Sequence, residues 1–263
     1  MPMAALPGVA LNVALLGPED GPPVVLLHGA TETFDVSWRR QVPALARHHR
    51  VIGPDLRGHG ASTNPADRLD LREMADDIVA LLDHLDHPSA HVVGFSGGAS
   101  VALFMALRAP DRLRSLTLIS NNFRRDRARA AAGFWDPEHI AARDPHWLGA
   151  MARWHAVPPA TLLGWWAAED ALRPAFEPSD LAAIRTPTLV VAGDRDAVVP
   201  LDESIRLYRA LPDARLCVLP GVGHGAPYAG ATLLNAALIA FVRQVEVQAH
   251  VEAEADRARS APE

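Results

Sequence analysis

A serine, a carboxylate and a histidine occur along this chain in an order that could support attack on a carbonyl group. Ser96 is the centre of the pentapeptide Gly94-Phe95-Ser96-Gly97-Gly98, and Asp196 and His224 follow it. A serine hydroxyl is a poor nucleophile unless a base removes its proton and a carboxylate orients that base. The three residue types therefore predict Ser96 as nucleophile, a downstream aspartate such as Asp196 as acid and His224 as base.

The segments on either side of the pentapeptide indicate how Ser96 is held. The apolar run 90–93 precedes it directly, and the helical pattern 99–107 follows it. Only small residues fit at positions 94, 97 and 98, because the strand and helix backbones nearly touch in such a tight turn. The pattern predicts a strand–turn–helix unit with the Ser96 hydroxyl exposed above the sheet edge.

Two later apolar runs predict the strands that carry the acid and the base. Residues 188–192 lead into a loop with Asp194 and Asp196, and residues 214–219 lead into the loop with His224. The continuous apolar run 188–192 is typical of a strand buried in a parallel sheet, and residues 214–219 are expected to form another strand. Both aspartates remain candidates for the acid on this pattern alone.

These motifs together resemble the α/β-hydrolase superfamily over roughly residues 6–245. The family order of nucleophile, acid and base is the order Ser96, Asp196, His224. His28-Gly29 looks like the family's oxyanion loop, and residues 55–62 look like its loop after the next strand.

The resemblance also implies roles for single residues. It favours Asp196 over Asp194 as the acid, because Asp196 stands three residues before Val199-Pro200. It implies that His28 braces the oxyanion loop rather than acting as a second base, and that Asp55, Arg57 and His59 likewise brace their loop.

Two backbone N–H groups must stabilise the negative oxygen that forms during attack on a carbonyl. Gly97, directly after the nucleophile, is expected to supply one of them. Ala30 is expected to supply the other, with Thr31 as the alternative donor.

The expected fold class is α/β, namely an α/β-hydrolase fold with a mostly parallel eight-stranded sheet flanked by helices and an inserted helical cap. Residues 1–120 and 184–245 are expected to form the core, 121–183 the cap, and 246–263 a polar C-terminal tail that is solvated or frayed. The core elements located on the pattern are strands at 11–16, 24–27, 51–53 and 116–120 and helices at 37–48, 71–85, 202–211 and 233–245.

The expected cap contains five of the six tryptophans, which predicts an apolar, aromatic-walled substrate pocket. Packing within the cap is the alternative role for each indole. We expect the pocket residues to be Phe95, Trp135, Trp154 and Trp165. The basic cluster 124–129 is either a solvated surface or a site for an acidic substrate group.

Composition limits the partners, the chemistry and the cell compartment that we expect for this protein. The chain has 263 residues, a net charge of −6 and a pI of about 6.0, which do not suggest nucleic acid or an anionic membrane as partner. All 25 basic residues are arginine, so lysine-based chemistry is excluded. The single Cys217 and the absence of a signal-peptide pattern or long apolar run lead us to expect a cytoplasmic protein. We expect no cofactor and no metal, and either a monomer or a homodimer.

The predicted function is a serine hydrolase that cleaves a carboxylic ester or lactone of a small apolar substrate through an acyl-enzyme. Ser96 excludes relatives that use an aspartate nucleophile, and Gly225 after His224 differs from the tryptophan usual in carbon–carbon bond hydrolases. A thioesterase, a cofactor-free perhydrolase and an acyltransferase remain alternatives. A slow-turnover small-molecule receptor with the same three residues is the alternative of another class.

Overall fold

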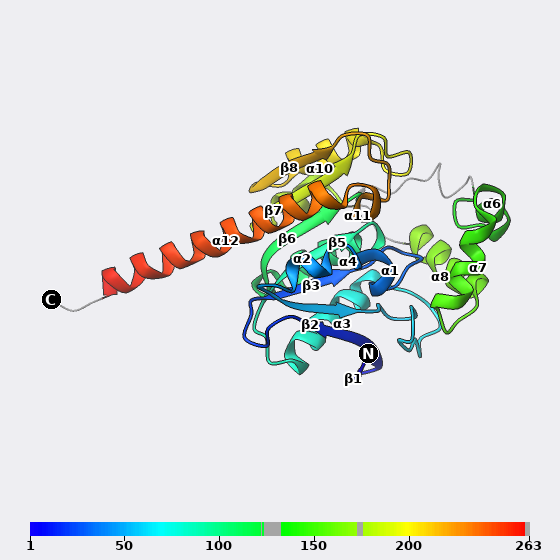
Figure 1. The fold of residues 1–263 in the computed structure, drawn as a ribbon, viewed down its shortest axis with the longest axis horizontal. Helices are drawn as coiled ribbons and strands as arrows, with labels where there is room; N and C mark the ends of the chain where they lie inside the picture. Colours follow the sequence, from blue (N-terminus) through cyan, green and yellow to red (C-terminus); the bar gives the residue numbers. More distant parts are fainter. Residues whose placement is uncertain (122, 124–132, 173–175, 261–263) are drawn as a thin grey trace.

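An eight-stranded sheet forms the centre of the molecule in a computed structural model that describes residues 1–121, 123, 133–172 and 176–260 (Figure 1). The strand order is β1-β2-β4-β3-β5-β6-β7-β8. β2 pairs antiparallel with both β1 and β4, and every other neighbouring pair, from β4-β3 through to β7-β8, is parallel, which confirms the predicted fold class. The strands are β1 (Met3–Leu6), β2 (Val9–Leu16), β3 (Pro23–Leu27), β4 (Arg50–Pro54), β5 (Ala90–Phe95), β6 (Leu113–Ile119), β7 (Thr188–Gly193) and β8 (Ala214–Leu219).

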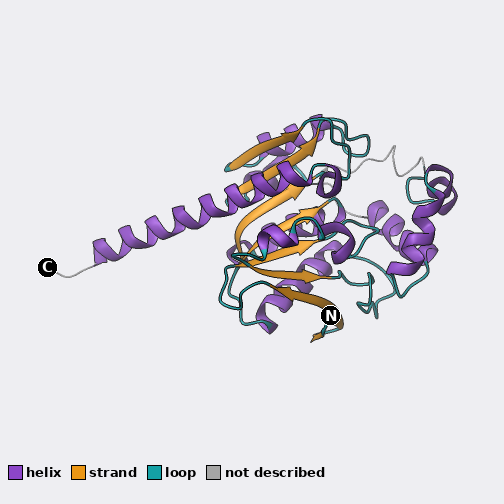
Figure 2. Cartoon of the chain, in the orientation of Figure 1, coloured by secondary structure: helices purple, strands orange, loops and turns teal. Residues whose placement is uncertain are grey.

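Helices cover both faces of this sheet, each face with its own apolar core (Figure 2). One face carries α3 (Leu71–His84), α4 (Gly97–Arg108) and α10 (Leu201–Ala210). The other carries α1 (Phe34–Trp38), α2 (Val42–Leu45), α11 (Ala226–Ala229) and α12 (Ala231–Ser260). Because helices shield both faces, every residue of β3, β5 and β7 is buried, which explains their unbroken apolar pattern.

The parallel register brings the carboxyl ends of the central strands to one edge. Leu27 pairs with Gly94, Phe95 with Ile119, and Gly193 with Leu219. The loops that follow β3, β5, β7 and β8 therefore meet above the same edge of the sheet. This edge is where ligands bind in open α/β sheets.

The helix predicted over 37–48 is wrong as a single element. The chain instead forms α1 and α2 with a break between Trp38 and Val42, and Pro43 occupies the first turn of α2. Proline lacks a backbone N–H and its ring clashes with the preceding turn, so it is tolerated only at the start of a helix. The helices predicted at 71–85 and 202–211 match α3 and α10 within one residue at each end.

The segment between β6 and β7 forms helices, and the described part of it contains no strand. Its helices are α6 (Pro137–Arg143), α7 (Pro145–Trp154), α8 (Pro159–Leu172) and α9 (Pro178–Ala182). The first three contact one another beyond the strand ends (Figure 1), whereas α9 packs on α10. Asp136 and Asp144 cap α6 and α7, followed by proline at the first helical position. The basic cluster 124–129 lies outside the described residues.

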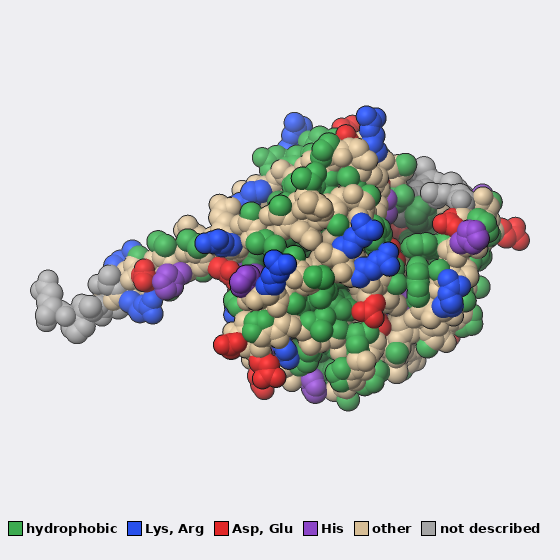
Figure 3. Space-filling view, in the orientation of Figure 1, with side chains coloured by type: hydrophobic (Ala, Val, Ile, Leu, Met, Phe, Trp, Pro, Cys, Tyr) green, Lys and Arg blue, Asp and Glu red, His purple; other side chains and the backbone are tan. Residues whose placement is uncertain are grey.

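The C-terminal region departs from expectation, because α12 does not end near Val245. It continues as one helix to Ser260, and its last part projects from the body and carries arginine, acidic and histidine side chains (Figures 1 and 3). Alanine, glutamate and arginine favour helix, and contacts one turn apart, such as His250 to Glu254 at 3.2 Å, add support. The tail is solvated as expected but helical rather than frayed. Across the described residues, no helix is both long and apolar enough to cross a membrane.

Candidate active site

Ser96 occupies a strained turn between β5 and α4. Its backbone has φ 51° and ψ −113°, a conformation that residues with a side chain rarely adopt. The turn is tight, because a Cβ on Gly94 would lie 2.5 Å from the Cα of Ala99, and one on Gly98 would lie 2.4 Å from the carbonyl oxygen of Leu27. The turn therefore requires residues without a side chain at Gly94 and Gly98, as the sequence of the pentapeptide predicted.

Ser96, His224 and Asp196 form one continuous hydrogen-bonded series. The Oγ of Ser96 lies 3.0 Å from Nε2 of His224, and Nδ1 of His224 lies 2.9 Å from Oδ2 of Asp196. This arrangement lets Asp196 accept from Nδ1–H, which leaves Nε2 free to accept the serine proton. The three residues follow different strands, β5, β8 and β7, and meet because those strands end at one edge.

The Asp196 carboxylate is built to remain ionised. Its side chain has 0% exposure, and its Oδ1 accepts hydrogen bonds of 2.8 Å from the N–H groups of Val198 and Val199. Burial favours the neutral form, but the hydrogen bonds and charge of His224 together with these two N–H groups hold the pKa of Asp196 below its ordinary value.

The alternative acid, Asp194, points elsewhere. Its Oδ1 accepts a 2.6 Å hydrogen bond from the N–H of Gly221, which ties together the loops after β7 and β8. After β6, Asn121 donates from Nδ2 to the Ser100 hydroxyl at 2.9 Å, so it braces the first turn of α4. The geometry therefore associates Asp196, and not Asp194, with His224.

Ala30 and Gly97 lie side by side, as an oxyanion site would require. A Cβ on Gly97 would lie 3.0 Å from the Cβ and 3.1 Å from the Cα of Ala30, so the two residues are close neighbours. Gly97 is the first residue of α4, where backbone N–H groups lack partners within the helix. The positive end of the α4 dipole also favours negative charge at this point.

Two buried histidines hold the loop that contains Ala30. His28 Nδ1 lies 2.8 Å from Gly29 O, and His28 Nε2 accepts from the N–H of Leu56 at 2.9 Å. His59 Nε2 accepts from the indole N–H of Trp166 at 3.0 Å, so the neutral ring carries its proton on Nδ1, 2.9 Å from Arg57 O, and the ring packs against the loop with Nε2 2.8 Å from Ala30 O. Burial is the main cause that lowers the pKa of both histidines to about 3, so each stays neutral near pH 7.

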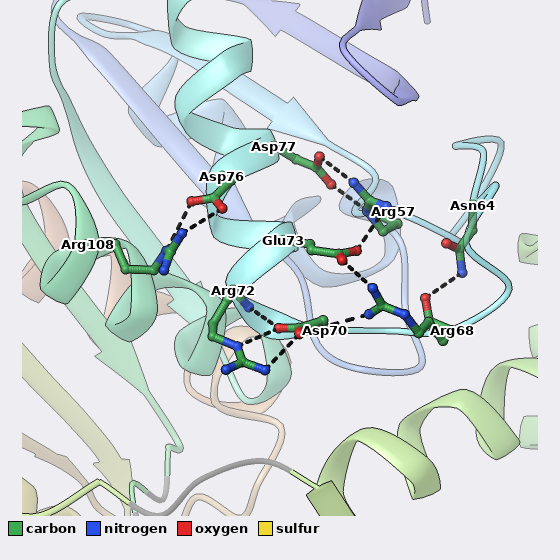
Figure 4. A network of polar contacts seen from close by, with 9 residues as sticks. All are labelled: Arg57, Asn64, Arg68, Asp70, Arg72, Glu73, Asp76, Asp77 and Arg108. Atoms are coloured by element: carbon green, nitrogen blue, oxygen red, sulfur yellow. Dashed lines mark hydrogen bonds and ion pairs between the residues drawn. The ribbon is translucent and has the colours of Figure 1, made fainter.

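The loop after β4 is anchored to α3 by arginine pairs (Figure 4). Arg57 donates from Nε and Nη2 to both carboxylate oxygens of Asp77 at 2.8 and 2.7 Å. This pairing explains why Asp77 can be buried although its side chain is charged. Asp55 accepts from the side chain of Asn12 at 2.7 Å and the N–H of Phe34 at 2.9 Å. Asp55 and Arg57 therefore brace the loop that positions His59.

A cavity of about 420 Å³ opens onto Ser96 and His224, a size that suits a small organic ligand. Of the expected pocket residues, Phe95 and Trp135 line it. Trp154 and Trp165 do not, which corrects that expectation: Trp154 borders a different cavity, and the Trp165 ring packs against Gly58. The remaining apolar wall comes from Phe134, Ile140, Trp147 and Val198.

The cavity is also lined by residues that the sequence analysis did not predict, among them Glu32, Tyr228 and Trp147. Glu32 is 5% exposed, and its carboxylate accepts a short hydrogen bond from the Ser37 hydroxyl. Burial is the main cause that raises the pKa of Glu32, and burial together with Glu32 raises that of Tyr228. Glu32 lies close to Ala30 in the sequence and Tyr228 lies close to His224, and this closeness could have indicated that both residues border the site.

Sequence analysis also did not identify Trp166, which lies beside Gly97 and donates a hydrogen bond to His59. Its ring stacks on Trp135 with centroids 5.7 Å apart and lies 2.9 Å from where a Cβ on Gly97 would be. No group of three metal-ligating side chains occurs within the described ranges.

Two family models together match residues 22–254 of the chain. A sequence model described as alpha/beta hydrolase fold matches residues 22–164, and one described as TAP-like protein matches residues 165–254. The dihydrolipoyllysine-residue acetyltransferase component of the acetoin cleaving system from Pseudomonas putida is 33% identical over 87% of this chain. The match spans 65% of that relative, less than two thirds of its length.

Two further relatives match this chain over nearly their whole length. RutD of Caulobacter sp. (strain K31), which is named as a carbamate hydrolase, is 31% identical over 86% of this chain and 92% of its own length. The solved structure of a thermophilic esterase from Thermogutta terrifontis with bound malate superposes with a TM-score of 0.78 at 29% identity. That superposition covers 92% of this chain and 97% of that one.

Proposed function

Because this chain belongs to the alpha/beta hydrolase fold family and is a hydrolase, we propose that it cleaves a carboxylic ester or lactone of a small apolar substrate with Ser96 as nucleophile. The proposal rests on two hydrogen-bond distances, 3.0 Å from Ser96 Oγ to His224 Nε2 and 2.9 Å from His224 Nδ1 to Asp196 Oδ2. The similarity to a structure named as an esterase supports the choice of an ester bond.

Acylation begins when Ser96 Oγ attacks the substrate carbonyl carbon and its proton passes to His224 Nε2. The carbonyl oxygen becomes negative and accepts hydrogen bonds from the N–H groups of Ala30 and Gly97. Asp196 stabilises the imidazolium that forms. The tetrahedral intermediate then expels the alkoxide, which takes the proton from His224, and the acyl group remains on Ser96.

Deacylation repeats these steps with water. His224 removes a proton from a water molecule, the hydroxide attacks the acyl carbon, and Ser96 leaves with the proton from His224. The products are a carboxylic acid and an alcohol, or one hydroxy acid when the substrate is a lactone. Every proton transfer in this sequence uses His224 Nε2, the one ring nitrogen that does not face Asp196.

The cavity supports a small substrate with an apolar part. Phe95, Phe134, Trp135, Ile140 and Trp147 supply aromatic and aliphatic surface next to Ser96. An apolar substrate gains about 0.8 kcal/mol for each buried methylene. Burial raises the pKa of Glu32 and so favours a neutral carboxyl group in this wall, which could hydrogen-bond to a neutral substrate group.

A carbamate is the second candidate substrate class. Its carbonyl accepts the same attack by Ser96, and Glu32 and Tyr228 place polar groups in the cavity close to His224 where an amino group could bind. The relative named as a carbamate hydrolase motivates this alternative. Its chemistry differs only in the leaving or acyl group, so one substrate series can compare both.

The test is a series of p-nitrophenyl esters, lactones and carbamates with the purified full chain, together with labelling by a fluorophosphonate probe. We expect many turnovers per minute on a short ester and covalent labelling at Ser96. A single turnover, or none, on every substrate would favour the small-molecule receptor. Transfer to an added alcohol or thiol in preference to water would instead identify an acyltransferase, and preference for thioesters a thioesterase.

A further inference from the structure

Three histidines surround the loop Gly29–Glu32, and one of them, His155, comes from the inserted helices. His155 Nε2 lies 3.1 Å from Thr31 O, and His155 Nδ1 accepts from the N–H of Gly60 at 2.9 Å. Since Nδ1 accepts, a neutral His155 carries its proton on Nε2 and donates it to Thr31 O. Its side chain thus joins the inserted segment to two core loops at once.

The contact of His155 with Thr31 is connected to Ala30 through the backbone. The carbonyl of one residue and the N–H of the next belong to one planar peptide group, so holding one orients the other. Thr31 O is held by His155, and the N–H of the same peptide, that of Glu32, donates to Gly29 O at 3.1 Å. Gly29 O shares its peptide group with the N–H of Ala30, the candidate oxyanion donor.

His28 holds the same carbonyl from the core side. Its Nδ1 lies 2.8 Å from Gly29 O, while its Nε2 accepts from Leu56, so the neutral ring donates to Gly29 O. The peptide that carries the Ala30 N–H is therefore restrained by His28 directly and by His155 through the Thr31–Glu32 peptide. The restraint from His155 exists only while the inserted helices are seated on the core.

His155 lies at the end of a helix that also borders the cavity. His155 directly follows α7, and Trp147 near the start of the same helix lines the cavity beside Ser96. A single rigid helix thus contacts the substrate space at one end and the candidate oxyanion loop at the other. His155 is 8% exposed, so water competes little with its two hydrogen bonds.

We propose that His155 is a positioning residue through which the inserted helices hold the Ala30 N–H in its oxyanion-binding orientation, an inference that rests on the proposed function. His155 does not touch the reacting atoms. It acts through the Thr31 carbonyl, so its loss should weaken binding of the negative oxygen in the transition state more than binding of the substrate.

Three substitutions separate the two hydrogen bonds. His155→Phe keeps a ring but removes both bonds. His155→Asn keeps an acceptor for the Gly60 N–H but is too short to reach Thr31 O, whereas His155→Gln can place an amide N–H near the position of Nε2. His146→Phe is the matched control, because His146 is exposed on the same helix.

The readouts are kcat and KM on a short p-nitrophenyl ester, inhibition by a trifluoromethyl ketone, and hydrogen exchange of residues 28–33. The ketone forms an adduct with serine whose oxygen is negative, so its affinity reports on the oxyanion site. We expect His155→Phe and His155→Asn to lower kcat by up to about 10²-fold, the scale of a small misplacement. KM should change little, ketone affinity should fall in parallel, and exchange at Glu32 should accelerate. His155→Gln should recover much of the loss, and His146→Phe should match wild type.

Unchanged kcat and ketone affinity in a folded His155→Asn protein would overturn the proposal, and that variant decides the question if His155→Phe does not fold. A rise in KM alone would also overturn it, because it would assign His155 to pocket shape. If the wild type neither hydrolyses esters nor labels at Ser96, the proposed function fails. The exchange rates still decide whether His155 holds the loop, so the two failures are distinguishable.

Discussion

Nε2 of His224 lies 3.0 Å from Oγ of Ser96, although the two residues are 128 positions apart in the chain. The serine is held at this point by a backbone conformation with φ 51°, and the histidine by Asp196. A serine and a histidine in this contact, with the histidine supported on its far side, can exchange a proton without further movement.

Replacement of Ser96 tests both chemistry and strain. Ser96→Ala should lower kcat by up to about 10⁶, the scale known for a serine nucleophile in subtilisin. Ser96→Gly should be equally inactive but more stable than Ser96→Ala by about 1 kcal/mol, because glycine accepts a positive φ without steric cost. Ester hydrolysis and urea unfolding measure the two effects. Activity retained in Ser96→Ala would contradict the assignment of the nucleophile.

Two aspartates in one loop give a matched comparison. Asp196→Asn should lower kcat by roughly 10⁴, as the corresponding change does in a serine protease, because the amide favours the wrong imidazole tautomer. Asp194→Asn should have little effect, since an amide oxygen can still accept from the Gly221 N–H. Steady-state kinetics on one ester decides the matter, and a reversed pair of effects would mean that the acid is misassigned.

The tryptophans divide into those at the cavity and those in the surrounding packing. Trp147→Ala or Trp135→Ala should shift the preferred acyl-chain length, because both indoles line the cavity. Trp154→Ala and Trp165→Ala should leave that preference unchanged while lowering stability. Profiles of kcat/KM against chain length, with folding checked by circular dichroism, would show this division. A shift with Trp165→Ala alone would place the acyl group elsewhere.

Substitution of Glu32 tests whether burial favours a neutral carboxyl group in the cavity wall. Its pKa is raised chiefly by burial, so the carboxyl group is protonated at a higher pH than an exposed glutamate. Glutamine resembles the protonated acid in shape and hydrogen bonding, so Glu32→Gln should keep kcat/KM within a few-fold of wild type at pH 6–7. A loss of about 10²-fold or more would indicate that ionised Glu32 is required.

The buried histidines predict a pH dependence of stability with a defined sign. Burial lowers the pKa of His28 and His59 from the 6.5 of an exposed histidine to about 3 in the folded protein. Their contribution to stability is complete above pH 6.5 and is lost as the pH falls from 6.5 towards 3, because the unfolded chain binds the protons more tightly. In an NMR titration from pH 8 to 5, both rings should stay neutral in the folded protein and titrate in urea. Titration of His28 near pH 6.5 in the folded state would contradict the burial argument.

Much of the fold follows from short-range pattern. The runs 90–93 and 188–192 are buried strands in the structure, extended by at most two residues, because an apolar run is stable where both faces of a strand are covered. The run 214–219 is also a strand, although it lies at the sheet edge and is partly exposed. The single helix expected over 37–48 is wrong, because Pro43 cannot lie in the interior of a helix and instead occupies the first turn of α2. The end of α12 was missed because the polar composition of residues 246–260 suggested fraying, although its alanines, glutamates and arginines favour helix.

By itself, the sequence determined the turn around Ser96 and the order of the loops that meet above the sheet. Steric limits between neighbouring residues and the period of apolar side chains are properties of the chain alone, so they can be read without coordinates. Only the tertiary structure decided that Trp147 lines the cavity while Trp154 and Trp165 do not, and that His155 reaches Thr31. These contacts depend on how α7 and α8 are oriented on the core, and that orientation results from packing between segments far apart in sequence.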